Sequence, residues 1–148
     1  MLSFQDLRAR VATSVEALSG FRESRWSASL LGSDPNVVAH KSFAVDVPTS
    51  RILNGGTRQK TSEGLLVEST VEVSYLYAVR GDAQVSDMAA ALETDLDVVS
   101  AVLAVSRHDL SALLFDARTH SLLRGGDGSW RLCRITFRAV HQVRAQSV

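Results

Sequence analysis

The feature that most constrains the fold of this chain is an alternating run of residues between Leu65 and Val79. Because successive side chains of a β-strand point to opposite faces, apolar residues at every second position predict a strand with one buried face. Ser69 is the only break in that face, whose apolar members are Leu65, Val67, Val71, Val73, Tyr75, Tyr77 and Val79. The run is long for a strand, so its first half is a candidate for one side of a hairpin that projects beyond the sheet.

A second alternating segment, from Val37 to Val47, is expected to be a strand that ends at Pro48, because proline lacks the amide N–H of a sheet ladder. The connection that follows, residues 48–64, is polar and far longer than the usual strand connection of about two to five residues. Such segments are usually functional or disordered, so this one is interpreted as a projecting arm that contacts another molecule. Its candidate contact residues are Arg51, Asn54, Gly55, Gly56, Arg58 and Lys60.

Two segments have the periodicity of amphipathic helices. The first begins near Ser3, whose side chain is a suitable helix cap, and ends at Gly20. The second follows Asp82 and is expected to bury one continuous apolar stripe against the sheet. That stripe consists of Val85, Met88, Ala89, Leu92, Leu96, Val99 and Leu103.

Two more strands complete the pattern, one near Leu113 to Ala117 and one from Trp130 to Val143, joined by a glycine-rich turn. The order is therefore helix, strand, strand, helix, strand, strand. This order predicts an α+β fold in which two helices cover a four-stranded, largely antiparallel sheet, with a long extended loop or hairpin between the first two strands. The 148 residues are expected to form a single domain, residues 1–148.

Composition limits the partners of this domain. Sixteen basic and sixteen acidic residues cancel, so no net field favours autonomous binding to nucleic acid or an anionic membrane. Cys133 is the only cysteine, which excludes an intrachain disulfide and fits a reducing compartment. The first residues lack a signal-peptide pattern and no apolar run is long enough to span a bilayer, so we expect a soluble, cytoplasmic product.

The sequence offers no convincing catalytic, cofactor-binding or metal-binding motif. The densest set of potential ligands is His108, Asp109, Asp116 and His120, and a polar loop with an exposed strand face explains it better than a metal site does. No serine has a nucleophile-elbow pattern, and Cys133 falls on the apolar face of the last strand, where a thiol is usually inert. We therefore expect no cofactor and no enzymatic activity.

Charge is distributed unevenly along the chain. The second helix has acidic residues and no Lys or Arg, and its candidate interface residues are Asp87, Glu93 and Asp97. The last strand is rich in arginine, with Arg131, Arg134 and Arg138 as candidates. One interpretation is a set of solvated faces or internal ion pairs, which contribute little individually. The other is a head-to-tail contact, in which the acidic side of one subunit meets the basic side of the next and the rotation closes a ring.

This layout resembles the tail-terminator, or tail-completion, proteins of long-tailed bacteriophages and phage-like particles. The resemblance covers most of the chain. It rests on the N-terminal helix, the basic glycine-rich loop, the amphipathic second helix, and the strand segments Phe43 to Val47, Val71 to Tyr77, Gly128 to Leu132 and Ile135 to Ala139.

The resemblance implies a hexameric ring in the virion, at the head-proximal end of the tail, built from protein made in the host cytoplasm. Such a ring caps the tail tube, ends its polymerisation and provides the joint to the head connector. Its partners would be further copies of itself, the tail tube protein and the head-tail connector protein, with DNA at most passing through the ring and no membrane involved. The arm would contact the tube or the neighbouring subunit.

Two alternatives stay open at the level of sequence. One is another head-tail joining or minor tail protein, which would share this composition and touch a different ring. The other is a small α+β enzyme or ligand-binding domain that uses His108, Asp116 and His120.

Overall fold

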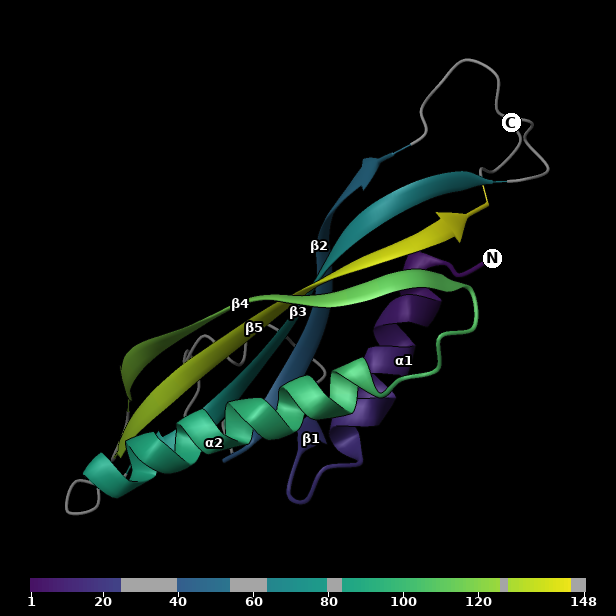
Figure 1. The fold of residues 1–148 in the computed structure, drawn as a ribbon. Helices are drawn as coiled ribbons and strands as arrows, with labels where there is room; N and C mark the ends of the chain where they lie inside the picture. The colour runs from purple at the N-terminus through teal and green to yellow at the C-terminus, as the bar shows by residue number, and fades with distance from the viewer. Residues whose placement is uncertain (25–39, 54–63, 80–83, 126–127, 145–148) are drawn as a thin grey trace.

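Two helices cover one face of a five-stranded sheet in the computed structural model, which describes residues 1–24, 40–53, 64–79, 84–125 and 128–144 (Figure 1). The elements are α1 (Phe4–Glu16), β1 (Arg22–Glu23), β2 (Ser42–Ile52), β3 (Leu65–Val79), α2 (Gln84–Leu103), β4 (Leu110–Gly125) and β5 (Gly128–Val143). The strand order is β1-β2-β3-β5-β4. Neither of the described helices is long and apolar enough to cross a membrane.

The α+β class and the two helices agree with the sequence prediction, whereas the four-stranded sheet was wrong in detail. The sheet has five strands and is mixed, because β1 pairs parallel to β2 while the other pairs are antiparallel. β1 has only two residues. Alternation cannot be recognised over so short a segment, so the sequence gives no signal for this strand.

The strand β2 does not end at Pro48, and this prediction was also wrong. β2 continues to Ile52 and pairs with β3 as far as Val67. The register shifts between Asp46 and Thr49, so that Pro48 sits at an irregularity in the ladder, where a missing amide N–H costs least. The first part of the predicted arm, residues 48–52, is therefore sheet.

The main core lies between the helices and the inward face of the sheet, and a smaller buried cluster, Ala44, Leu76 and Leu132 with Trp130 packed against it, lies at one end of the opposite face. β3 and β5 pair along their whole length, from Leu65 with Val143 to Val79 with Ser129. The first half of β3 therefore does not project beyond the sheet as the sequence suggested. Cys133 lies on the inward face of β5, as predicted, and the inward residues of this strand are completely buried; they are Cys133, Ile135, Phe137 and Ala139.

The N-terminal segment is fixed to this core at two places. Ser3 caps α1 by accepting a hydrogen bond from the Asp6 amide at 3.0 Å, as the sequence predicts. His141 is buried one step beyond Ala139 on the inward face, and its two ring nitrogens lie 2.8 Å from the Leu2 carbonyl oxygen and 2.7 Å from the Ser69 hydroxyl. Ser69, the polar break in β3, thus has a specific partner.

Candidate assembly surfaces

The predicted arm is described only at its base. Arg51 lies on β2 with an exposed side chain, and its Nε donates to Glu68 Oε1 on the neighbouring strand at 3.1 Å. Such exposed pairs contribute little to stability, so Arg51 remains available for other contacts. The other five candidates, Asn54, Gly55, Gly56, Arg58 and Lys60, lie outside the described residues.

The helix α2 presents a different face to the sheet from the one predicted. Its core-facing positions include Ala91, Val98 and Val102, together with the polar residues Asp87, Thr94 and Asp95. The apolar stripe expected in the core is only partly there. Val99 and Leu103, near the C-terminal end, pack against the core, whereas Val85, Ala89, Leu92 and Leu96 are exposed.

Asp95 explains why α2 is rotated about its own axis relative to the predicted orientation. Its side chain is completely buried, and its two carboxylate oxygens have separate partners. Tyr75 Oη donates to Oδ1 at 2.5 Å, and His120 Nε2 lies 2.5 Å from Oδ2. The Arg118 guanidinium lies 3.6 Å from the same Oδ2. A buried carboxylate is tolerated only with such partners, so Asp95 holds this side of α2 against the sheet.

The tautomer of His120 follows from its neighbours. Arg131 Nε is 2.6 Å from His120 Nδ1 and can only donate, so Nδ1 accepts and Nε2 carries the proton that is donated to Asp95. The result is one connected network, from Arg131 through His120 and Asp95 to Tyr75. Burial, with Cys133 and Asp95 nearby, raises the pKa of the Tyr75 hydroxyl far above its usual value, which keeps it a donor.

Asp95, His120 and Cys133 also form a potential metal site, with ligand atoms within 4.8 Å of one another. Three observations argue against it. His120 Nε2 donates its proton to Asp95, Arg118 and Arg131 already supply positive charge, and the Cys133 thiol donates to the Arg131 carbonyl oxygen at 3.9 Å. These residues fit a satisfied hydrogen-bond network better than a metal centre.

The histidine and aspartate set considered from the sequence is not assembled. His108 is exposed beside Asp109, in a loop that Arg10 of α1 holds through the carbonyls of Ser106 and His108. Asp116 pairs instead with Arg138 at 3.2 Å. Only His120 takes part in a cluster, and its partners come from α2 and β5. The sequence carried one signal for this cluster, which is Tyr75 on the predicted buried face of its strand. The hydroxyl of a buried tyrosine usually needs a hydrogen-bond partner.

The three arginines of the predicted basic side lie on two faces. Arg131 points to the helix side, where it contacts His120. Arg134 and Arg138 lie on the opposite face, where their cross-strand neighbours on β4 are Thr119 and Leu114. Each of these two has an intrachain partner, Glu72 at 4.0 Å for Arg134 and Asp116 for Arg138. The internal ion pairs that the sequence left open are therefore present.

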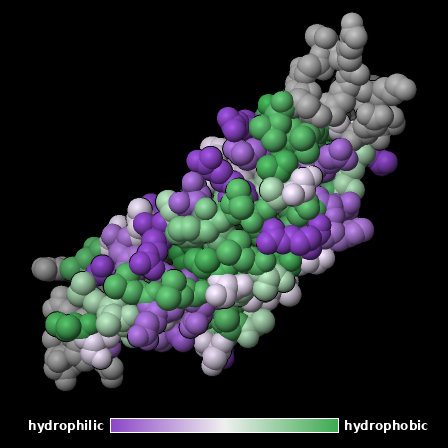
Figure 2. Space-filling view, in the orientation of Figure 1, coloured by the Kyte–Doolittle hydropathy of each residue, from purple (hydrophilic) through white to green (hydrophobic). Residues whose placement is uncertain are grey.

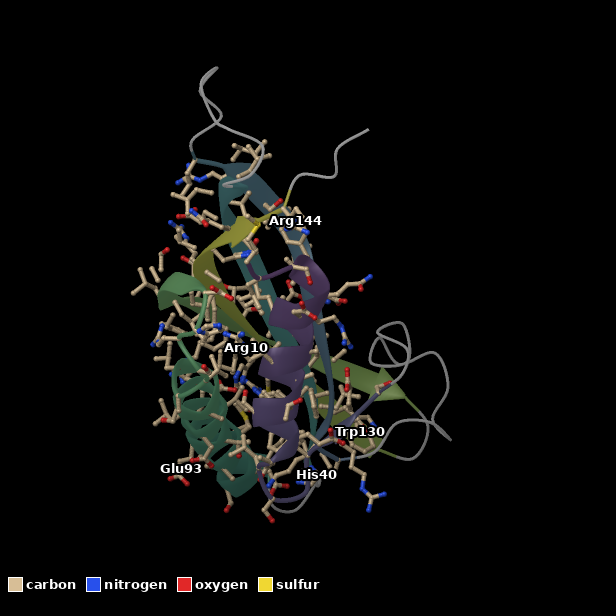
Figure 3. The ribbon with its side chains drawn as sticks, turned by 90° about the vertical axis from the view of Figure 1, so that its right-hand side faces the viewer. Arg10, His40, Glu93, Trp130 and Arg144 are labelled. Carbon is tan, nitrogen blue, oxygen red and sulfur yellow. The ribbon has the colours of Figure 1, made fainter. Side chains whose placement is uncertain are left out.

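The acidic residues of α2 also separate. Asp87 is buried on the core side, whereas Glu93 and Asp97 are exposed on the outer surface of the helix. Figure 3 shows Glu93 on the side of α2 that points away from the rest of the molecule. The outer surface of α2 thus combines two acidic side chains with the exposed apolar stripe.

A chain with a similar fold is part of a solved virion structure. A chain in a solved structure described as "Virion of native gene transfer agent (GTA) particle" matches with a TM-score of 0.51 and 19% sequence identity, over 93% of this chain and 95% of that chain. At this identity the likeness shows the fold. No protein-family model matches the chain, and no curated protein matches it.

Proposed function

We propose that this chain is a structural virion protein, and specifically a tail terminator that forms a hexameric ring on the end of the tail tube. The observation that carries the proposal is the fold shared, over nearly the full length of both chains, with a chain in a gene transfer agent virion. Gene transfer agent particles are phage-like, which agrees with the family that the sequence layout resembles. The proposed activity is binding without catalysis.

The physical task of a terminator explains the surfaces that the chain offers. A tube of stacked rings has an open end on which the next ring would dock. The terminator must occupy that end, present a different outer face to the head connector, and contact its own copies around the ring. A domain for this task needs several separate exposed surfaces, and the outer side of α2, the open sheet face and the base of the arm are three of them.

We assign the predicted arm, residues 48–64, whose base at residues 48–52 is part of the sheet, to contact with the tube or the neighbouring subunit. Arg51 marks its start, where the side chain is exposed and only weakly paired. If this assignment is correct, limited proteolysis cuts the arm faster in the free protein than in assembled tails. Equal rates of cleavage in the two states would show that assembly does not cover the arm.

A second candidate is another head-tail joining or minor tail protein, which the same shared fold supports. Electron microscopy of particles made without this protein separates the two. Overlong tails indicate a terminator, since tube growth has lost its stop. Tails of normal length separated from full heads indicate a joining protein. Normal particles would refute both candidates.

A further inference from the structure

The exposed apolar stripe of α2 has no covering element in the described part of the chain. It consists of Val85, Ala89, Leu92 and Leu96, and the two leucines expose 43% and 59% of their surface. In Figure 2, hydrophobic residues gather over α2 and over the middle of the molecule, between hydrophilic ones. Grouped aliphatic side chains on one exposed surface are typical of a protein interface.

The stripe is held outward by the fold and is not a loosely packed part of the core. Leu92 follows Ala91, which is buried, and each helical residue turns the chain by about 100°. Asp95, fixed to Tyr75 and His120, prevents α2 from rolling to bury the leucines instead. The position of the stripe is therefore a built property of this domain.

The charges beside the stripe restrict its partner. Glu93 and Asp97 are exposed on the outer surface of the same helix, and α2 contains no Lys or Arg. A surface that covers the leucines also lies against these carboxylates. The partner must therefore offer apolar area together with positive charge, since like charges at an interface are unfavourable.

The open face of the sheet in another copy of this chain offers both. Leu114 on β4 is 61% exposed, and its cross-strand neighbour Arg138 is exposed beside it. Arg134 lies further along the same face. Between these two positions, the exposed residues of β4 on this face are the small Ala117 and Thr119, together with Asp116, which pairs with Arg138. Such a strip leaves room for a helix, and the exposed pairs that hold the two arginines are weak enough to exchange partners.

We propose that α2 of one subunit docks, through Leu92 and Leu96, on the β4–β5 part of the open sheet face of a second copy, with Glu93 and Asp97 facing Arg134 and Arg138. The two surfaces lie on opposite sides of the sheet, so the contact is head-to-tail. Every copy keeps one unused surface of each kind until a ring closes. This inference rests on the proposed ring and names the residues that join its subunits.

Sedimentation of the purified protein over a concentration series tests the α2 surface. The wild type is expected to self-associate, and the double substitution Leu92→Ser with Leu96→Ser is expected to weaken association by about tenfold or more, since it removes two apolar side chains from the interface. Gln5→Ser with Ala9→Ser is the control, because both side chains are exposed on α1, outside α2, the arm and the β4–β5 sheet face. A monomeric wild type, or equal weakening by both variants, would overturn the proposal.

A charge exchange tests the partner surface. Glu93→Arg and Arg138→Glu are each expected to weaken association, and the two together are expected to restore most of it. Failure of the double variant to recover would refute the assignment of the open sheet face. Circular dichroism should show all variants folded, since every substituted side chain is exposed.

The tail assay separates this inference from the proposed function. If α2 substitutions leave association unchanged but particles without the protein have overlong tails, the docking surface is wrong and the terminator stands. If such particles have normal tails, the terminator is wrong whatever the sedimentation result.

Discussion

Replacing Asp95 by alanine should destabilise the domain severely, because it removes the centre of the buried network. The carboxylate accepts from Tyr75 and His120 at 2.5 Å each and is completely buried. A hydrogen bond to a charged group contributes about 1.5–3 kcal/mol, so the two together account for about 3–6 kcal/mol. This agrees with the cost of about 3–5 kcal/mol for removing one partner of a buried ion pair. Domains of this kind are stable by only about 5–15 kcal/mol.

Urea unfolding of a small set of variants measures this cost. Tyr75→Phe should lose less, about 1.5–3 kcal/mol, because it removes one of the two hydrogen bonds and leaves Asp95 bound to His120. The double variant Tyr75→Phe with Asp95→Ala should lose less stability than the sum of the losses of the two single variants, since both substitutions remove the same hydrogen bond. Asp97→Ala is the matched control on the exposed side of the helix, expected within about 0.5 kcal/mol of wild type.

An Asp95→Ala variant of unchanged stability would refute the role of the buried network. If the free energy of unfolding of Asp95→Ala lay within about 0.5 kcal/mol of the wild-type value, and its slope against urea concentration were unchanged, the network would not hold α2. The explanation for the outward-facing leucines would then fail as well, because it depends on the fixed rotation of that helix.

Three further predictions concern other buried groups. Cys133 should not react with a thiol reagent at pH 8 until the protein is unfolded, because burial raises its pKa to about 12; rapid reaction of the folded protein would contradict this. Burial lowers the pKa of His141, so only the unfolded state takes up the proton as the pH drops below about 6.5. The free energy of unfolding in urea should therefore fall over this pH range. If the difference in this free energy between wild type and His141→Gln did not change with pH, the prediction would be wrong. Gly64→Ala should lower the midpoint of thermal unfolding more than Gly20→Ala does. Both glycines have positive φ, but only at Gly64 would a Cβ lie 2.7 Å from a backbone oxygen, that of Val143. Equal losses would show that the contact with Val143 relaxes freely.

The sequence predicted those parts of the fold whose residue pattern is set by burial alone. Alternation in Leu65–Val79 identified the full extent of β3, and Cys133 was placed correctly on the buried face of β5. Ser3 marked the start of α1, since a cap depends on local chemistry, whereas the helix ends at Glu16, before the predicted stop at Gly20.

The misses have a common physical origin, which is tertiary contact. Pattern reasoning placed the apolar stripe of α2 in the core, because nothing local reveals that Tyr75 and His120 would compensate a buried Asp95. The arginines of β5 were assigned to one side by composition, although strand parity sends Arg131 to the face opposite Arg134 and Arg138. Pro48 was taken as a strand end because a bulge that accommodates it leaves no sequence signature.

The central claim is that this chain forms a ring at the head-proximal end of a phage-like tail, and a cryo-electron microscopy reconstruction of intact particles tests it most directly. We expect a single closed ring of this chain between the tail tube and the head connector, with α2 of each subunit against the open sheet face of the next. Absence of the chain from the particle, or its repetition along the whole tube, would contradict the account.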